Sequence, residues 1–161
     1  MSASPYAAAD SAKLAEILRL AESRLSAQLT LGIAADQRAM TMASFLAALD
    51  AAAIAGWAVI GAGQGFAMGA LVIGFGIAAA LATFSAQPVA WCVPGGLPSG
   101  WLDDIVEGDT LHNGFAAMAE HYDAMIIQND AVLAANGTKM TMAFVAMLLT
   151  LILAAVLAFV R

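Results

Sequence analysis

The sequence predicts an all-α integral membrane protein with three transmembrane helices and long cytoplasmic helical extensions. Of the 161 residues, 62% are hydrophobic and only 11% are charged, whereas soluble domains carry about 25% charged residues. No Asp, Glu, Lys or Arg occurs from Ala51 through Leu102. Because that stretch is far too long for one buried helix of a soluble protein, we expect it to hold most of two membrane spans.

Residues 1–39 predict a cytoplasmic helix with Ser11 as its N-cap. Charges of alternating sign every three residues are typical of a solvated helix face. A single apolar stripe recurs at spacings of three and four: Leu14, Leu18, Ala21, Leu25, Leu29 and Ile33. The region lacks the apolar core of a signal peptide, so we expect the amino terminus to stay in the cytoplasm.

Residues 40–60 predict the first span, since their length matches the roughly 20 residues that cross hydrocarbon. No breaker separates this span from the preceding helix, so we expect one helix from about Ser11 to Ile60. The glycine-rich stretch 61–65 predicts a tight turn, and residues 66–86 predict the second span, which Pro88 ends.

Residues 87–139 predict a cytoplasmic loop and helix, and residues 140–160 predict the third span. The loop is rich in Pro and Gly, and a helix resumes near Thr110 and continues through Gly137. Arg38 and Lys139 flank the first and third spans on one side, which the positive-inside rule assigns to the cytoplasm. We therefore expect a bacterial inner-membrane protein with a cytoplasmic N-terminus and a periplasmic C-terminus.

Asp50 lies halfway along the first span, where an ionised carboxylate costs about 2.5–3.5 kcal/mol. Acids at this depth are often functional, which favours a pore-lining, proton-relay or cation-coordinating role. The alternative is a protonated acid that hydrogen-bonds a neighbouring helix, and the sequence leaves both open.

Small residues at four-residue spacing predict close helix packing, within or between subunits. One ladder consists of Gly61, Gly65 and Gly69, and the next consists of Ala70, Gly74, Ala78 and Ala82. Trp91 and Trp101 flank the Pro/Gly-rich loop. They predict either an aromatic belt at headgroup level or a loop that stacks on a ligand.

The pattern of chemically reactive residues predicts no enzyme, no cofactor and no metal site. Cys92 is the single cysteine, and the His and acidic residues at 112–123 lack a metal-ligand spacing. No nucleophile-elbow, Walker or dinucleotide-binding pattern occurs. The formal net charge of −6 argues against a broad nucleic-acid surface.

The Ala35-Asp36-Gln37-Arg38-Ala39 junction before the first span, together with this helical layout, resembles small membrane effectors of bacterial anti-phage signalling. The likeness is to Pycsar-type transmembrane effectors, where an Asp-x-Lys-Ala junction stands at this place and Arg38 replaces the lysine here. Hailong-type systems contain a similar membrane effector.

The resemblance implies a homo-oligomeric ion channel or pore in the lipid bilayer that disrupts the inner membrane. It also implies control by a nucleotide or oligonucleotide messenger from a partner nucleotidyltransferase or cyclase. Arg24, Arg38 and Lys139 are then candidate ligand-binding cations. The alternatives are a membrane scaffold without conductance and a cation- or proton-linked transporter that uses Asp50.

Overall fold

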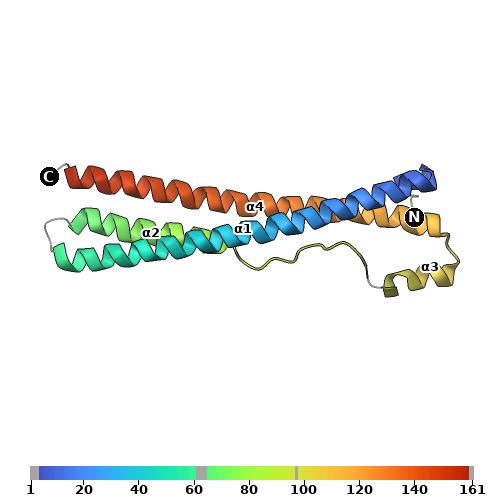
Figure 1. Ribbon diagram of the computed structural model, residues 1–161, viewed down its shortest axis with the longest axis horizontal. Helices are drawn as coiled ribbons and strands as arrows, with labels where there is room; N and C mark the ends of the chain where they lie inside the picture. Colours follow the sequence, from blue (N-terminus) through green and yellow to red (C-terminus); the bar gives the residue numbers. More distant parts are fainter. Residues whose placement is uncertain (1–3, 61–64, 97, 160–161) are drawn as a thin grey trace. The chain divides into compact units, whose positions relative to one another are not determined.

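The computed structural model describes residues 4–60, 65–96 and 98–159, and every regular element in these ranges is helical (Figure 1). The elements are η1 (Pro5–Ala8), α1 (Ser11–Ile60), α2 (Gly65–Ser85), η3 (Pro98–Trp101), α3 (Leu102–Glu107) and α4 (Leu111–Phe159). Helices α1, α2 and α4 are long and apolar enough to cross a membrane. The all-α prediction and the three apolar helices are thereby confirmed.

The chain divides into two compact units. Residues 1–32 and 89–133 form the first, which we call the loop-bearing unit. Residues 33–88 and 134–161 form the second, which we call the apolar unit. Helices α1 and α4 each contribute one segment to each unit.

Helix α1 extends over the predicted range, but its N-cap is Asp10 rather than Ser11. The Asp10 Oδ1 atom accepts a hydrogen bond from the Lys13 backbone N–H at 2.7 Å, and Ser11 is already the first helical residue. A carboxylate both satisfies an amide of the first turn and complements the positive end of the helix dipole. Ion pairs form on the solvated face that the alternating charges predicted, with Arg19 Nη2 at 2.6 Å from Glu16 Oε1.

The core of the loop-bearing unit joins the first part of α1 to the first part of α4. Its buried members are Leu14, Leu18, Ala21, Leu25, Ala116, Ala119 and Tyr122. The predicted stripe is wrong at its end, because Ile33 is 60% exposed while Gln28 is 2% exposed. The buried positions 14, 18, 21, 25, 28 and 32 follow the seven-residue repeat of helices that wind around each other, whereas our stripe drifted off that repeat.

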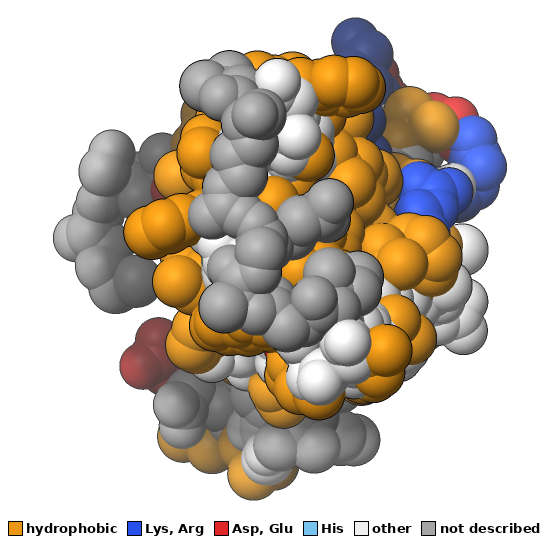
Figure 2. Space-filling model, turned by 90° about the vertical axis from the view of Figure 1, so that its left-hand side faces the viewer, with side chains coloured by type: hydrophobic (Ala, Val, Ile, Leu, Met, Phe, Trp, Pro, Cys, Tyr) orange, Lys and Arg blue, Asp and Glu red, His pale blue; other side chains and the backbone are white. Residues whose placement is uncertain are grey.

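The apolar unit packs the second part of α1 against α2 and the second part of α4. Its buried core is formed by Ala43, Leu46, Phe75, Ala78, Ala82 and Ala143, and small residues such as these let helices approach closely. Large hydrophobic side chains remain on the outside. Figure 2, which views this unit end-on, shows hydrophobic side chains over most of the described surface. That distribution suits a lipid environment.

Helix α2 runs from Gly65 to Ser85, within one residue at each end of the range predicted for the second span, and its crossing of a membrane stays a prediction. Of the predicted turn at 61–65, residues 61–64 lie outside the described part, and Gly65 opens α2. The short helix α3 was not predicted. It ends at Glu107, and the following Gly108 has a positive φ of 71°, which suits glycine. Helix α4 then continues through Gly137, as expected.

Candidate functional site

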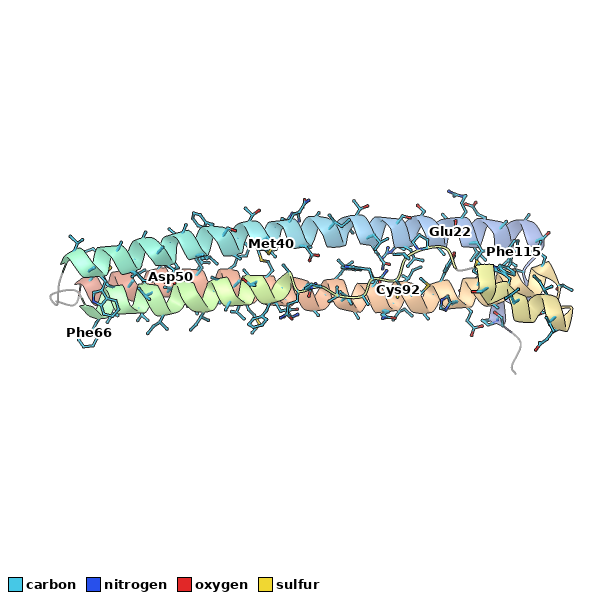
Figure 3. The ribbon with its side chains drawn as sticks, turned by 90° about the horizontal axis from the view of Figure 1, so that it is seen from below. Glu22, Met40, Asp50, Phe66, Cys92 and Phe115 are labelled. Carbon is cyan, nitrogen blue, oxygen red and sulfur yellow. The ribbon has the colours of Figure 1, made fainter. Side chains whose placement is uncertain are left out.

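Asp50 lies in the apolar unit on the side of α1 that faces α2 (Figure 3). A Cβ atom built on Gly76 of α2 would lie 3.9 Å from Asp50 Oδ2. The other carboxyl oxygen, Oδ1, is buried and has no hydrogen-bond partner among the described residues. Because a buried polar atom without a partner is costly, this oxygen calls for a proton, a water, an ion or a second polar group.

The glycines predicted to pack the spans lie against large or branched side chains of the same unit. A Cβ on Gly65 or Gly69 would lie 3.8 Å from the Trp57 ring of α1, which is ordinary contact. A Cβ on Gly74 would overlap the Thr150 side chain of α4. Gly61 lies outside the described residues. Sequence reasoning missed Gly76, because nothing in the spacing distinguished it from its neighbours.

A buried polar cluster in the loop-bearing unit was also missed. Asn129 is 0% exposed; its Nδ2 donates to the Cys92 carbonyl at 2.9 Å, and its Oδ1 accepts from the Cys92 N–H at 3.0 Å. Gln28 Nε2 donates to the Ile126 carbonyl at 3.0 Å and to Asp130 Oδ1 at 2.7 Å. Figure 3 shows Cys92 on the irregular connection beside α4. The cluster therefore fastens this connection to the helices.

Trp91 and Trp101 both pack against helical glycines within the loop-bearing unit. A Cβ on Gly32 would lie 2.5 Å from Trp91 Cζ2, and a Cβ on Gly114 would lie 2.6 Å from Trp101 Cζ3. Trp101 also meets Phe115 edge to face, with ring centroids 6.1 Å apart. Such packing was not among the roles predicted for these rings, and ligand stacking by them stays a prediction.

The candidate ligand-binding cations differ in what they already contact. In the loop-bearing unit, Arg24 Nη2 lies 3.3 Å from Asp130 Oδ2. In the apolar unit, Lys139 Nζ donates to the Phe84 carbonyl at 3.3 Å and to Asn136 Oδ1 at 3.4 Å. Arg38, also in the apolar unit, is exposed and makes no ion pair or hydrogen bond with a described residue.

Comparisons of this chain with protein-family models, with curated proteins and with solved structures found no match. Among the His, Cys, Asp and Glu side chains that the structure describes, which do not include those of Asp103 and Asp104, no three gather closely enough to hold a metal ion. Asp50 and the cations Arg24, Arg38 and Lys139 are therefore the candidate functional groups among the described residues.

Proposed function

We propose that this chain is one subunit of a homo-oligomeric, gated ion pore in the bacterial inner membrane. Its purpose would be that of an anti-phage effector under the control of a nucleotide-type signal. The observation that carries the proposal is the Asp50 carboxyl group, whose Oδ1 is buried at mid-span without a described partner.

A carboxyl group at this depth is tolerated chiefly where it meets water, an ion or another polar group. Within the chain, Asp50 Oδ2 faces the bare backbone of Gly76. Asp50 as a whole is half-buried, so a change of its side-chain rotamer would turn the carboxyl group toward a second copy of the chain, or toward the water and ions of a pore between copies, which would supply the missing partner. A ring of carboxylates from several subunits would attract cations, as acidic rings do in cation channels.

The pore would have to form between copies rather than inside one. The core of the apolar unit is filled by side chains such as Leu46 and Phe75, each under 5% exposed. A filled core leaves no path for ions through a single subunit. The exposed hydrophobic side chains around the unit provide surface for contact with other copies as well as with lipid.

The defence role and the nucleotide-type signal rest on the resemblance at residues 35–39. Neighbouring genes offer a direct check. A nucleotidyltransferase or cyclase gene beside this one would support the signal, and its absence from related loci would count against it.

The deciding experiment compares the parent with Asp50→Asn and Asp50→Ala in reconstituted bilayers. Both variants should lose conductance or cation preference while the oligomer mass measured by light scattering stays unchanged. Ser44→Ala is the matched control, since it removes a polar group from the same helix. The Ser44 Oγ atom already donates a hydrogen bond to the Met40 carbonyl at 2.9 Å. That control should conduct like the parent.

Several outcomes would overturn the pore. A monomer in detergent, or an oligomer that never conducts, favours a scaffold. Equal conductance in parent and both variants makes Asp50 a packing residue. If Asp50→Asn conducts like the parent and Asp50→Ala does not, Asp50 acts through a neutral hydrogen bond and not through its charge. Asparagine keeps the shape of the side chain but cannot ionise.

A further inference from the structure

A side-opening crevice of about 930 Å³ lies within the apolar unit, where α1, α4 and the end of α2 meet. Most of its wall is apolar, and its large apolar side chains are Met42, Phe45, Met140 and Phe144. Phe45 is 54% exposed and Phe144 is 45% exposed. The crevice therefore offers a long apolar surface to whatever occupies it.

The polar part of the wall carries an unpaired positive charge. Arg38 lines the crevice and is the one described Lys or Arg without an ion pair or hydrogen bond. Asn136 also lines it, and its Oδ1 is taken by Lys139 Nζ at 3.4 Å. Because that hydrogen bond orients the Asn136 side-chain amide, its Nδ2 atom remains available to donate to a ligand. No Asp or Glu is among the described residues that line the crevice, so this end of the crevice favours an anion.

Gly137 supplies an independent sign that the space is kept open. Gly32, Gly74 and Gly114 each face a side chain that a Cβ would hit, so close packing explains them. Gly137 also lines the crevice, yet a Cβ there would meet nothing within 4 Å. Since glycine in a helix interior costs about 1 kcal/mol relative to alanine, packing inside the chain does not account for this residue.

We propose that this crevice binds an anionic phospholipid, with the phosphate on Arg38 and an acyl chain along Phe45 and Phe144. Arg38 and Lys139 border the first and third predicted spans, at the depth where anionic headgroups of the cytoplasmic leaflet attract basic residues. A free nucleotide would leave the apolar wall in contact with water, whereas an acyl chain covers it. The inference rests on the membrane insertion contained in the proposed function, but not on conduction.

The test uses the full chain in detergent, stripped of lipid, and measures binding by titration calorimetry. Both lipids carry a phosphate, but the choline ammonium cancels the net charge of phosphatidylcholine and is repelled by Arg38. Dioctanoyl phosphatidylglycerol should therefore bind about tenfold more tightly than dioctanoyl phosphatidylcholine. Glycerol phosphate, which lacks the chains, should not bind at the same concentrations. Arg38→Gln should abolish the preference. Arg19→Gln, with the same change of charge at an exposed and already paired guanidinium, should keep it.

A second pair of variants tests the crevice itself. Gly137→Leu places a side chain in the open space and should weaken phosphatidylglycerol binding at least about tenfold by occlusion. Ala135→Leu adds the same bulk at an exposed position outside the lining and should bind like the parent. Circular dichroism and oligomer mass verify the fold of both. If Gly137→Leu does not fold, the Arg38→Gln comparison still decides.

Equal affinity for the two lipids, or an unchanged preference in Arg38→Gln, would overturn the lipid site. The lipid site would also be overturned if a nucleoside monophosphate bound more tightly than the lipid and its binding depended on Arg38. Asp50→Asn should bind phosphatidylglycerol like the parent, so a protein that binds the lipid without conducting would overturn the pore alone. A protein that conducts without preferring phosphatidylglycerol would overturn this inference alone.

Discussion

Asn129 shows how much of the loop-bearing unit depends on single polar side chains. It occupies a heptad position of α4 that a hydrophobic residue would ordinarily fill, and it is fully buried. Its amide meets both backbone polar groups of Cys92, so the irregular connection is held without secondary structure of its own. A buried amide with this many partners specifies one alignment of the connection on the helix.

Asn129→Ala should destabilise the loop-bearing unit by about 2 kcal/mol, because it leaves the Cys92 N–H and carbonyl without partners. The single thiol of the chain reports this directly. Maleimide labelling of Cys92 should become about tenfold faster. Gln128→Ala, at an exposed neighbouring position, should leave the labelling rate unchanged. Equal rates in the two variants would show that Asn129 does not hold the connection.

Tyr6 docks the N-terminal turn on α4, where its hydroxyl donates to Asp123 Oδ2. The Ser4 hydroxyl adds a hydrogen bond to the Ala116 carbonyl at 3.2 Å. The hydrogen bond to Asp123, with burial and the negative charges of Asp123 and Glu120, raises the pKa of the Tyr6 phenol above its ordinary value. The neutral phenol is the donor, so this contribution is complete below about pH 10 and is lost as pH rises through the raised pKa.

Absorbance titration of phenolate should therefore contain a late component that belongs to Tyr6. Tyr6→Phe should remove that component. Asp123→Asn should move it to lower pH, because the amide keeps an acceptor oxygen but removes the negative charge. Tyr122 is the other tyrosine and remains as a common background in all three proteins. A titration of Tyr6 that is unchanged in Asp123→Asn would contradict the docking.

Helix packing in both units depends on which residues share one seven-residue repeat. On α4, buried residues recur at 122, 129, 136, 143 and 150, and on α1 they recur at 25, 32, 39, 46 and 53. These positions include Gly32 and the polar residues Asn129 and Asn136. Hydrophobicity alone therefore does not reveal the repeat. The register of the helices follows from the whole repeat, with the polar members making specific bonds.

The same substitution at two glycines should have opposite effects. Gly74→Ala should destabilise the apolar unit by about 1–3 kcal/mol, because its methyl group would overlap Thr150 of α4. Gly137→Ala should stabilise α4 by up to about 1 kcal/mol, because the methyl group meets open space and alanine is the better helix former. Helicity during unfolding in mixed micelles measures both. Destabilisation by Gly137→Ala would show that its glycine has a packing role.

At the scale of the whole molecule, the order of apolar helices determines the topology that we expect. Three crossings place the two ends of the chain on opposite sides of a bilayer. Arg38 and Lys139 border the first and third predicted spans, and the stretch predicted to connect the first two spans carries no Lys or Arg. The positive-inside rule then predicts that the N-terminus and residues 87–139 face the cytoplasm.

Fusion reporters test this topology. After Arg161, a reporter enzyme that works only in the periplasm should be active. Within residues 100–110, a reporter that works only in the cytoplasm should be active. Replacing Arg38 and Lys139 by Glu should weaken the preference for one orientation, because basic residues beside the spans keep their side of the chain in the cytoplasm. A cytoplasmic C-terminus in the parent would remove one of the three spans.

The sequence by itself determined the helical class, the ends of α1 and α2 and the three apolar helices. These follow from composition, uninterrupted helical pattern and breakers, all of which act locally. Only the tertiary structure decided that Gln28 and Asn129 are buried, that Trp91 and Trp101 pack on glycines, and that Asp50 faces Gly76. Each of these depends on which residue of a distant segment lies opposite. A local pattern does not specify such a partner, because neighbouring glycines and amides look alike until the helices are packed.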